Sequence, residues 1–85
     1  MLEKLVAVSD VAERMGIERS NARKWLKKQG FEFVVARDPV SRQIVNALPH
    51  SKAREAIDLR RLQGFPINSD SLIELREVVA VNEVD

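Results

Sequence analysis

Five basic residues within one ten-residue stretch are the side chains of this sequence best suited to bind a polyanion. Residues 19–28 contain no acid. The cations of this stretch are Arg19, Arg23, Lys24, Lys27 and Lys28. Arginine forms paired hydrogen bonds with a phosphate or a guanine edge, and lysine contacts phosphate as a point charge. Because the whole chain has a formal net charge of only +1, this cluster is a local feature and not the result of a basic composition.

Charge is distributed unevenly along the 85 residues. Residues 1–64 hold 13 Lys and Arg against 8 Asp and Glu, a net charge of +5, whereas residues 65–85 hold one Arg against five acids, a net charge of −4. Such asymmetry is typical of a basic binding domain with an acidic tail, although a solvated tail without a role has the same composition. We therefore expect a binding domain over residues 1–64 and an acidic C-terminal segment over residues 65–85.

The composition argues against an enzyme and against a metal protein. The chain has no Cys, its one His is His50, and its acids are scattered singly. These residues provide neither a nucleophile–base pair nor the ligand set of a zinc site, and we expect His50 at the surface. No apolar run is long enough to span a bilayer or to act as a signal peptide. The sequence thus predicts a cytoplasmic protein with no catalytic residue, metal or cofactor.

Two short helices joined by a tight turn are predicted around the start of the basic stretch. Ser9 suits the N-cap of a helix over residues 10–15, and Gly16 suits the left-handed residue that ends it. A second helix over residues 19–28 has its cations on one face and its apolar residues on the other. The apolar face consists of Ala22, Trp25 and Leu26. We expect Trp25 to belong to the core rather than to stack on a base.

A β-hairpin and a third helix are predicted to follow. Residues 31–37 are rich in aromatic and β-branched side chains, Asp38 and Pro39 suit a turn, and residues 42–47 indicate a return strand. A third helix is expected from Pro49, which suits the first helical position, to Gly64. A last helix is expected within the segment SLIELREVV. Its apolar side consists of Leu72, Leu75 and Val79.

A helix-turn-helix followed by a hairpin is the pattern of a winged helix-turn-helix. The sequence therefore predicts a mainly α domain with a small β-hairpin. The second helix would enter the major groove of double-stranded DNA, and the hairpin, taken as residues 31–46, would act as a wing. Base contacts are expected from Arg19, Ser20, Asn21 and Arg23, phosphate contacts from Lys24, Lys27 and Lys28, and wing contacts from Arg37 and Arg42.

Each of these assignments has a simpler alternative. A helix with cations on one face is often only a solvated face, and Asn21 suits a plain surface position as well as it suits an adenine contact. The hairpin can also cover the core without touching DNA. The lack of any acid between residues 19 and 28 favours DNA contact by the helix.

The order of residues resembles that of a group of DNA-binding domains. The segment VSDVAERMGIERSNARKWLKKQGF is similar to the winged helix-turn-helix of MerR-type regulators and phage excisionases. The segment RQIVNALPHSKAREAIDLRRLQG resembles the end of the N-terminal domain of phage Mu-type transposases and repressors. The resemblance covers residues 6–64. The turn sequence RDPVSRQIVN departs from that family, whose wings carry a glycine pair and an aromatic residue on the returning strand.

This resemblance implies sequence-specific binding of double-stranded DNA in a bacterial or phage-infected cell. The chain would be a repressor that regulates transcription, or the N-terminal domain of a transposase that acts in DNA recombination. Two alternatives are a small excisionase-like regulator and a protein-interaction module of a mobile-element assembly. In the last case the helix predicted within SLIELREVV would dock on a partner, on another domain of a parent protein or on a second copy of the chain.

Overall fold

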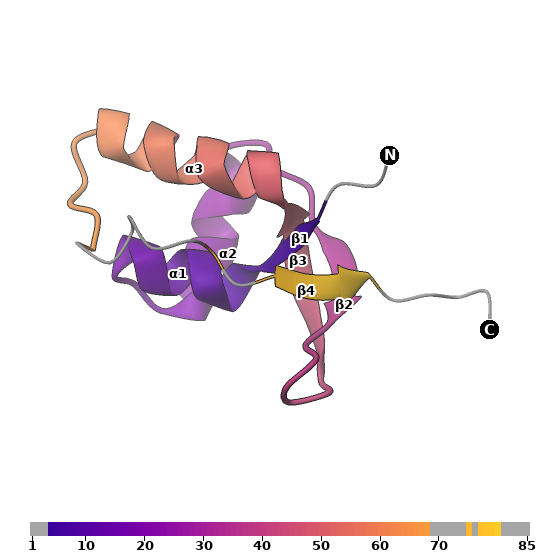
Figure 1. Ribbon diagram of the computed structural model, residues 1–85. Helices are drawn as coiled ribbons and strands as arrows, with labels where there is room; N and C mark the ends of the chain where they lie inside the picture. The colour runs from indigo at the N-terminus through magenta and orange to yellow at the C-terminus, as the bar shows by residue number, and fades with distance from the viewer. Residues whose placement is uncertain (1–3, 69–74, 76, 81–85) are drawn as a thin grey trace.

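A computed structural model describes residues 4–68, 75 and 77–80 of the chain. The helices lie at one end of the molecule and the strands at the other (Figure 1). The elements in chain order are β1 (Leu5–Ala7), α1 (Val8–Met15), α2 (Arg19–Lys28), β2 (Val34–Arg37), β3 (Ile44–Pro49), α3 (His50–Leu62) and β4 (Glu77–Ala80). The predicted hairpin is present as β2 and β3, and the three predicted helices of residues 1–64 are present as α1, α2 and α3.

The four strands form a closed antiparallel barrel, so the predicted fold class, a mainly α winged helix-turn-helix, is wrong. The order around the barrel is β1–β3–β2–β4, and β4 pairs back onto β1. In this register Val6 faces Leu48 between β1 and β3, and Arg37 faces Val79 between β2 and β4. The sequence predicts neither β1 nor β4. These two strands convert a hairpin into a barrel, and the domain is a small α/β domain.

Among the described side chains, each strand buries one small apolar residue inside the barrel, and Leu5 and Val45 pack against these residues as partly buried members. The four buried residues are Ala7, Ala36, Ala47 and Val78. Ala36 and Ala47 have no exposed surface. Alanine is a poor strand former. A barrel becomes narrower as its number of strands decreases, however, so the interior of a four-stranded barrel leaves little room for large, fully buried side chains. The alanines are therefore explained by closure of the barrel and not by local strand preference.

A second core joins the helices to one another and to the strands. Ala22 and Leu26 of α2 belong to this core and are fully buried, which confirms these two residues of the predicted apolar face. Trp25 is half-buried and packs against the same core. The other buried members are Val6, Val8, Val11, Ala12, Met15, Leu48, Ala53, Ala56, Ile57 and Leu75. One face of α2 is thus anchored, and the other is left exposed.

The helix ends differ from prediction by one or two residues where a strand adjoins them. Gly16 has φ 74° and ends α1 in the left-handed conformation, as predicted. Because β1 leads directly into α1, the helix begins at Val8 with Ala7 as its N-cap, and Ser9 is not the cap. Likewise β3 ends at Pro49, which is the N-cap of α3 and not its first residue. His50, expected at the surface, is half-buried at the start of α3.

The helix predicted near the C-terminus is replaced over its last residues by a strand. Val79 lies in β4, and Leu75 is buried in the core. Leu72 lies outside the described residues, as do residues 69–74, 76 and 81–85 as a whole. Among the residues that are described, no helix has the length and apolar character needed to cross a membrane.

Candidate nucleic-acid interface

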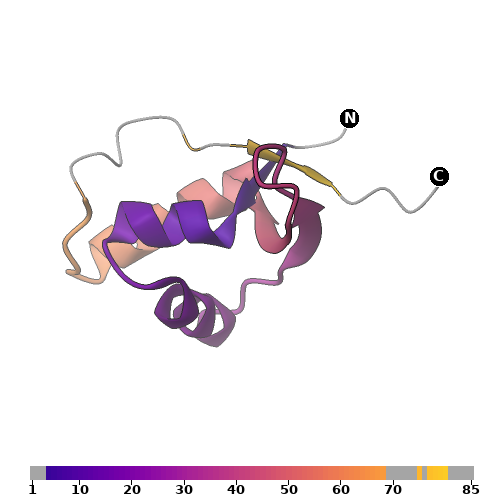
Figure 2. The same cartoon turned by 90° about the horizontal axis from the view of Figure 1, so that it is seen from below.

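The basic face of α2 is exposed over the whole length of the helix. The predicted contact residues Arg19, Ser20, Asn21, Arg23, Lys24, Lys27 and Lys28 are all exposed. The helix packs on α1 and protrudes from the body of the molecule (Figure 2). Within the described part of the chain, no carboxylate forms an ion pair with any of the five cations of α2. Their charge is therefore available to an external anion.

The exposed face of α2 divides into three strips, because successive residues are about 100° apart around an α-helix. Arg19 and Arg23 form the strip on the side of the hairpin, where both line a groove shared with β3. The central strip consists of Ser20, Lys24 and Lys27. Asn21 and Lys28 form the third strip, beside Trp25. Asn21 and Arg23, both predicted to contact bases, therefore lie on opposite edges of the exposed face.

The C-terminal half of α2 is fastened to α3 by a stacked arginine. The guanidinium carbon of Arg60 lies 5.1 Å from the centroid of the Trp25 ring and 4.1 Å from that of the Phe65 ring. The side-chain amide of Gln63 on the same side donates a hydrogen bond of 3.2 Å to the side-chain oxygen of Gln29. Cation–π contacts of this kind contribute about 0.5–2 kcal/mol. This arrangement gives Trp25 a structural role and holds α2 in a fixed position.

The loop between β2 and β3 is held in shape by Asp38, where a turn was expected from sequence. The Asp38 carboxylate oxygen Oδ1 accepts a hydrogen bond of 2.8 Å from the Val40 N–H, and the Asp38 carbonyl oxygen accepts one of 2.7 Å from the Arg42 N–H. Arg42 has φ 64° in the left-handed region. Arg37 and Arg42 are exposed, and Val40 near the tip is 80% exposed. The hairpin thus presents two cations, Arg37 at the end of β2 and Arg42 in a defined loop.

We expect Arg42→Gly to increase the free energy of unfolding by up to about 1 kcal/mol. An L-residue in the left-handed conformation costs about 1–2 kcal/mol, and the greater freedom of glycine in the unfolded chain offsets about 0.5–1 kcal/mol of this gain. Urea denaturation followed by circular dichroism measures the change. Arg42→Ala removes the same charge but keeps the strained φ, so it should not be stabilising. A glycine variant less stable than the alanine variant would contradict this explanation.

A groove of about 210 Å³ separates α2 from the hairpin. Three elements line it: α2 with Arg19 and Arg23, the start of α1 with Ser9, and the hairpin with residues 43–46. The sequence predicts the two arginines as contact residues but neither Ser9 nor Asn46. No local pattern identifies those two residues, because they meet α2 only when the hairpin folds beside the start of α1.

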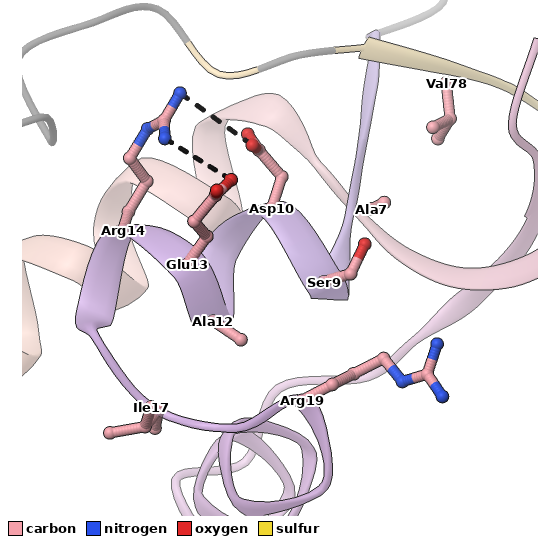
Figure 3. A pocket seen from close by; sticks show the side chains of 9 residues that line it. All are labelled: Ala7, Ser9, Asp10, Ala12, Glu13, Arg14, Ile17, Arg19 and Val78. Carbon is pink, nitrogen blue, oxygen red and sulfur yellow. Dashed lines mark ion pairs between the residues drawn. The ribbon is translucent and has the colours of Figure 1, made fainter. Parts of the chain in front are cut away.

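A wider pocket of about 600 Å³ beside α1 contains an ion-pair cluster (Figure 3). The Arg14 guanidinium lies 3.8 Å from the Asp10 carboxylate and 3.7 Å from the Glu13 carboxylate. Arg19 lines this pocket as well as the groove. Figure 3 shows its side chain extending past Ser9 and away from the cluster. Both acids of the pocket are thus paired with Arg14 and do not neutralise Arg19.

Comparison with protein-family models, with curated proteins and with solved structures finds no match to this chain. A functional assignment therefore depends on the chemistry of the surface. Its main features are the cations of α2, which pair with no carboxylate of the described residues, the cationic hairpin and the groove between these two elements.

Proposed function

We propose that this chain binds double-stranded DNA, with α2 in the major groove and the β2–β3 hairpin as a second contact. The observation that carries the proposal is the row of five cations on one protruding helix, none of them paired with a carboxylate of the described residues. An α-helix with its side chains is about 10–12 Å across, and the major groove of B-DNA is about 12 Å wide. The size of the helix and its charge both suit this ligand.

Different parts of the exposed face of α2 would make different kinds of contact with DNA. Ser20 and Lys24 lie on the central strip, which would face the floor of the groove. Both carry groups that can hydrogen-bond to base edges, so Lys24, which the sequence assigns to a phosphate, is also a candidate for a base contact. Asn21 lies at one edge of the exposed face, in the first turn, from which an amide can reach an adenine. Lys27 and Lys28, nearer the C-terminal end, would contact phosphates, which fix the register of a protein on DNA.

The resemblance of residues 6–64 to Mu-type DNA-binding domains supports a sequence-specific role, in a repressor or in the N-terminal domain of a transposase. The closed barrel differs from the fold that this resemblance implies. The proposal therefore depends on α2 and on the hairpin, not on membership of that family. The alternative function, docking through a C-terminal helix, required Val79 on the apolar side of that helix. Val79 lies in the strand β4 instead, so the docking surface is not formed as predicted.

Titration of a labelled 20-base-pair duplex of mixed sequence tests the proposal. We expect a dissociation constant of about 10⁻⁴–10⁻⁶ M near physiological salt. The logarithm of the binding constant should fall linearly with the logarithm of salt concentration, with a slope of about −0.9 per phosphate contact. Amide chemical shifts should change mainly at residues 19–28 and 37–42. Absence of binding at low salt, or shifts confined to other residues, would overturn the proposal.

A further inference from the structure

We infer that the groove between α2 and β3 seats a phosphate of one DNA strand, clamped by Arg19 and Arg23. This inference rests on the proposed function and deepens it. The sequence assigns both arginines to base edges. Their position in the fold assigns them instead to the backbone.

The charge in the groove is of one sign. Arg19 and Arg23 are four residues apart, so they lie on the same side of α2, and both line the groove. No carboxylate belongs to the described residues that line it. The Ser9 hydroxyl and the Asn46 amide are neutral groups able to donate hydrogen bonds. Guanidinium forks supported by neutral hydrogen-bond donors are well suited to bind phosphate.

The start of α1 also lines the groove, with Asp10 in its first turn offsetting part of the positive charge of the helix end. Val8 and Ser9, the first two residues of the helix, both line the groove. The N-cap residue Ala7 makes no side-chain hydrogen bond to the first turn. The N-terminus of a helix carries a partial positive charge from its backbone N–H groups. Asp10, the next residue, is buried and forms an ion pair with Arg14 in the neighbouring pocket.

The hairpin side of the groove is formed by a part of β3 that extends past β1. The pairing of β1 with β3 ends at Ala7 opposite Ala47. Residues 44–46 pair with β2 on their other side, so within the described residues this stretch has no strand partner on the side toward the groove. Its backbone edge and the Asn46 side chain can therefore face a ligand.

The location of the groove also matches the geometry of DNA. A phosphate backbone separates the major groove from the minor groove at every point along B-DNA. A protein with one helix in the major groove and a hairpin reaching beyond its rim must pass over that backbone. The groove lies between these two elements, so a backbone phosphate is the group that would meet Arg19 and Arg23.

Arg23→Gln, measured on three duplexes of unrelated sequence over a range of salt concentrations, tests the inference. We expect about tenfold weaker binding to every duplex, and a salt dependence whose slope is smaller by about 1. Arg19→Gln should behave in the same way. Arg23→Lys should keep most of the slope, because it keeps the charge. Arg54→Gln, which removes an exposed cation from α3, is the matched control and should leave the slope unchanged.

The outcomes separate this inference from the proposed function. If Arg23→Gln changes the relative affinities of the three duplexes and leaves the slope unchanged, Arg23 reads a base, and the inference is wrong while DNA binding stands. Tighter binding of inorganic phosphate than of duplex at equal ionic strength would identify a free-anion site and would also overturn it. A wild-type chain that binds no duplex at low salt overturns both proposals, before any variant is considered.

Discussion

Ala36→Leu is expected to lower the free energy of unfolding by about 3 kcal/mol, at the upper end of the usual cost of overpacking. Ala36 lies inside the barrel with no exposed surface, in the same buried cluster as Ala47 and Val78. Three additional carbon atoms cannot fit there unless the strands move apart. Since small domains are stable by only about 5–15 kcal/mol, urea denaturation followed by circular dichroism should show a large shift of the midpoint.

Val35→Leu is the matched control for this experiment. Val35 precedes Ala36 on β2, and its side chain is 53% exposed on the outside of the barrel. We expect a change within about 0.5 kcal/mol, as for most surface substitutions. If the two leucine variants were equally stable, the interior would be open on one side, and the closure of the barrel by β4 would be disproved.

Local pattern was sufficient to predict the three helices and the hairpin. In α2 the spacing of Ala22 and Leu26 defines the buried face, and Gly16 marks the turn before the helix. These signals arise within one or two helical turns, so they can be read without knowledge of distant partners. The exposure of all seven predicted contact residues on α2 follows from the same periodicity.

The barrel could not be predicted in the same way. The strand β1 has three residues and no room for an alternating pattern, and it continues directly into a helix. The strand β4 depends on pairing with β1 and β2, which lie far away in the sequence. In addition, the leucine spacing before β4 is typical of a helix. The alanines inside the barrel are weak strand formers, and only closure explains them.

The candidate site, too, could be predicted only in part from local sequence. The cations of α2 are visible in the sequence as a run without acids. Their separation into strips follows from helical periodicity. The tertiary fold alone determines which of these strips faces the hairpin. Ser9 and Asn46 gain their place in the groove because β3 extends past the end of β1. The assignment of Arg19 and Arg23 to a backbone phosphate therefore required the structure.

Reversing the charge of Lys24 and Lys27 should weaken duplex binding by about 100-fold or more at 0.1 M salt. Both side chains are exposed on the central strip of α2. Loss of each charge-assisted contact costs about 1.5 kcal/mol or more, and 1.4 kcal/mol corresponds to a factor of ten in the dissociation constant. The variant Lys24→Glu, Lys27→Glu would be compared with the wild type by fluorescence anisotropy, with circular dichroism to confirm that both are folded.

The control for this variant is Lys52→Glu, Arg54→Glu on α3, which changes the net charge by the same amount at exposed positions. Among the described residues, Lys52 and Arg54 form one ion pair in the wild type, between Lys52 and Glu55 at 3.4 Å. It lies on the surface, so its loss in the variant should cost little stability. If DNA contacts α2, the α3 variant should bind within about threefold of the wild type, because charges farther from the ligand than about 10 Å are screened at this salt. Equal losses in the two double variants would show that affinity follows total charge, and the exposed face of α2 would then be only a solvated surface.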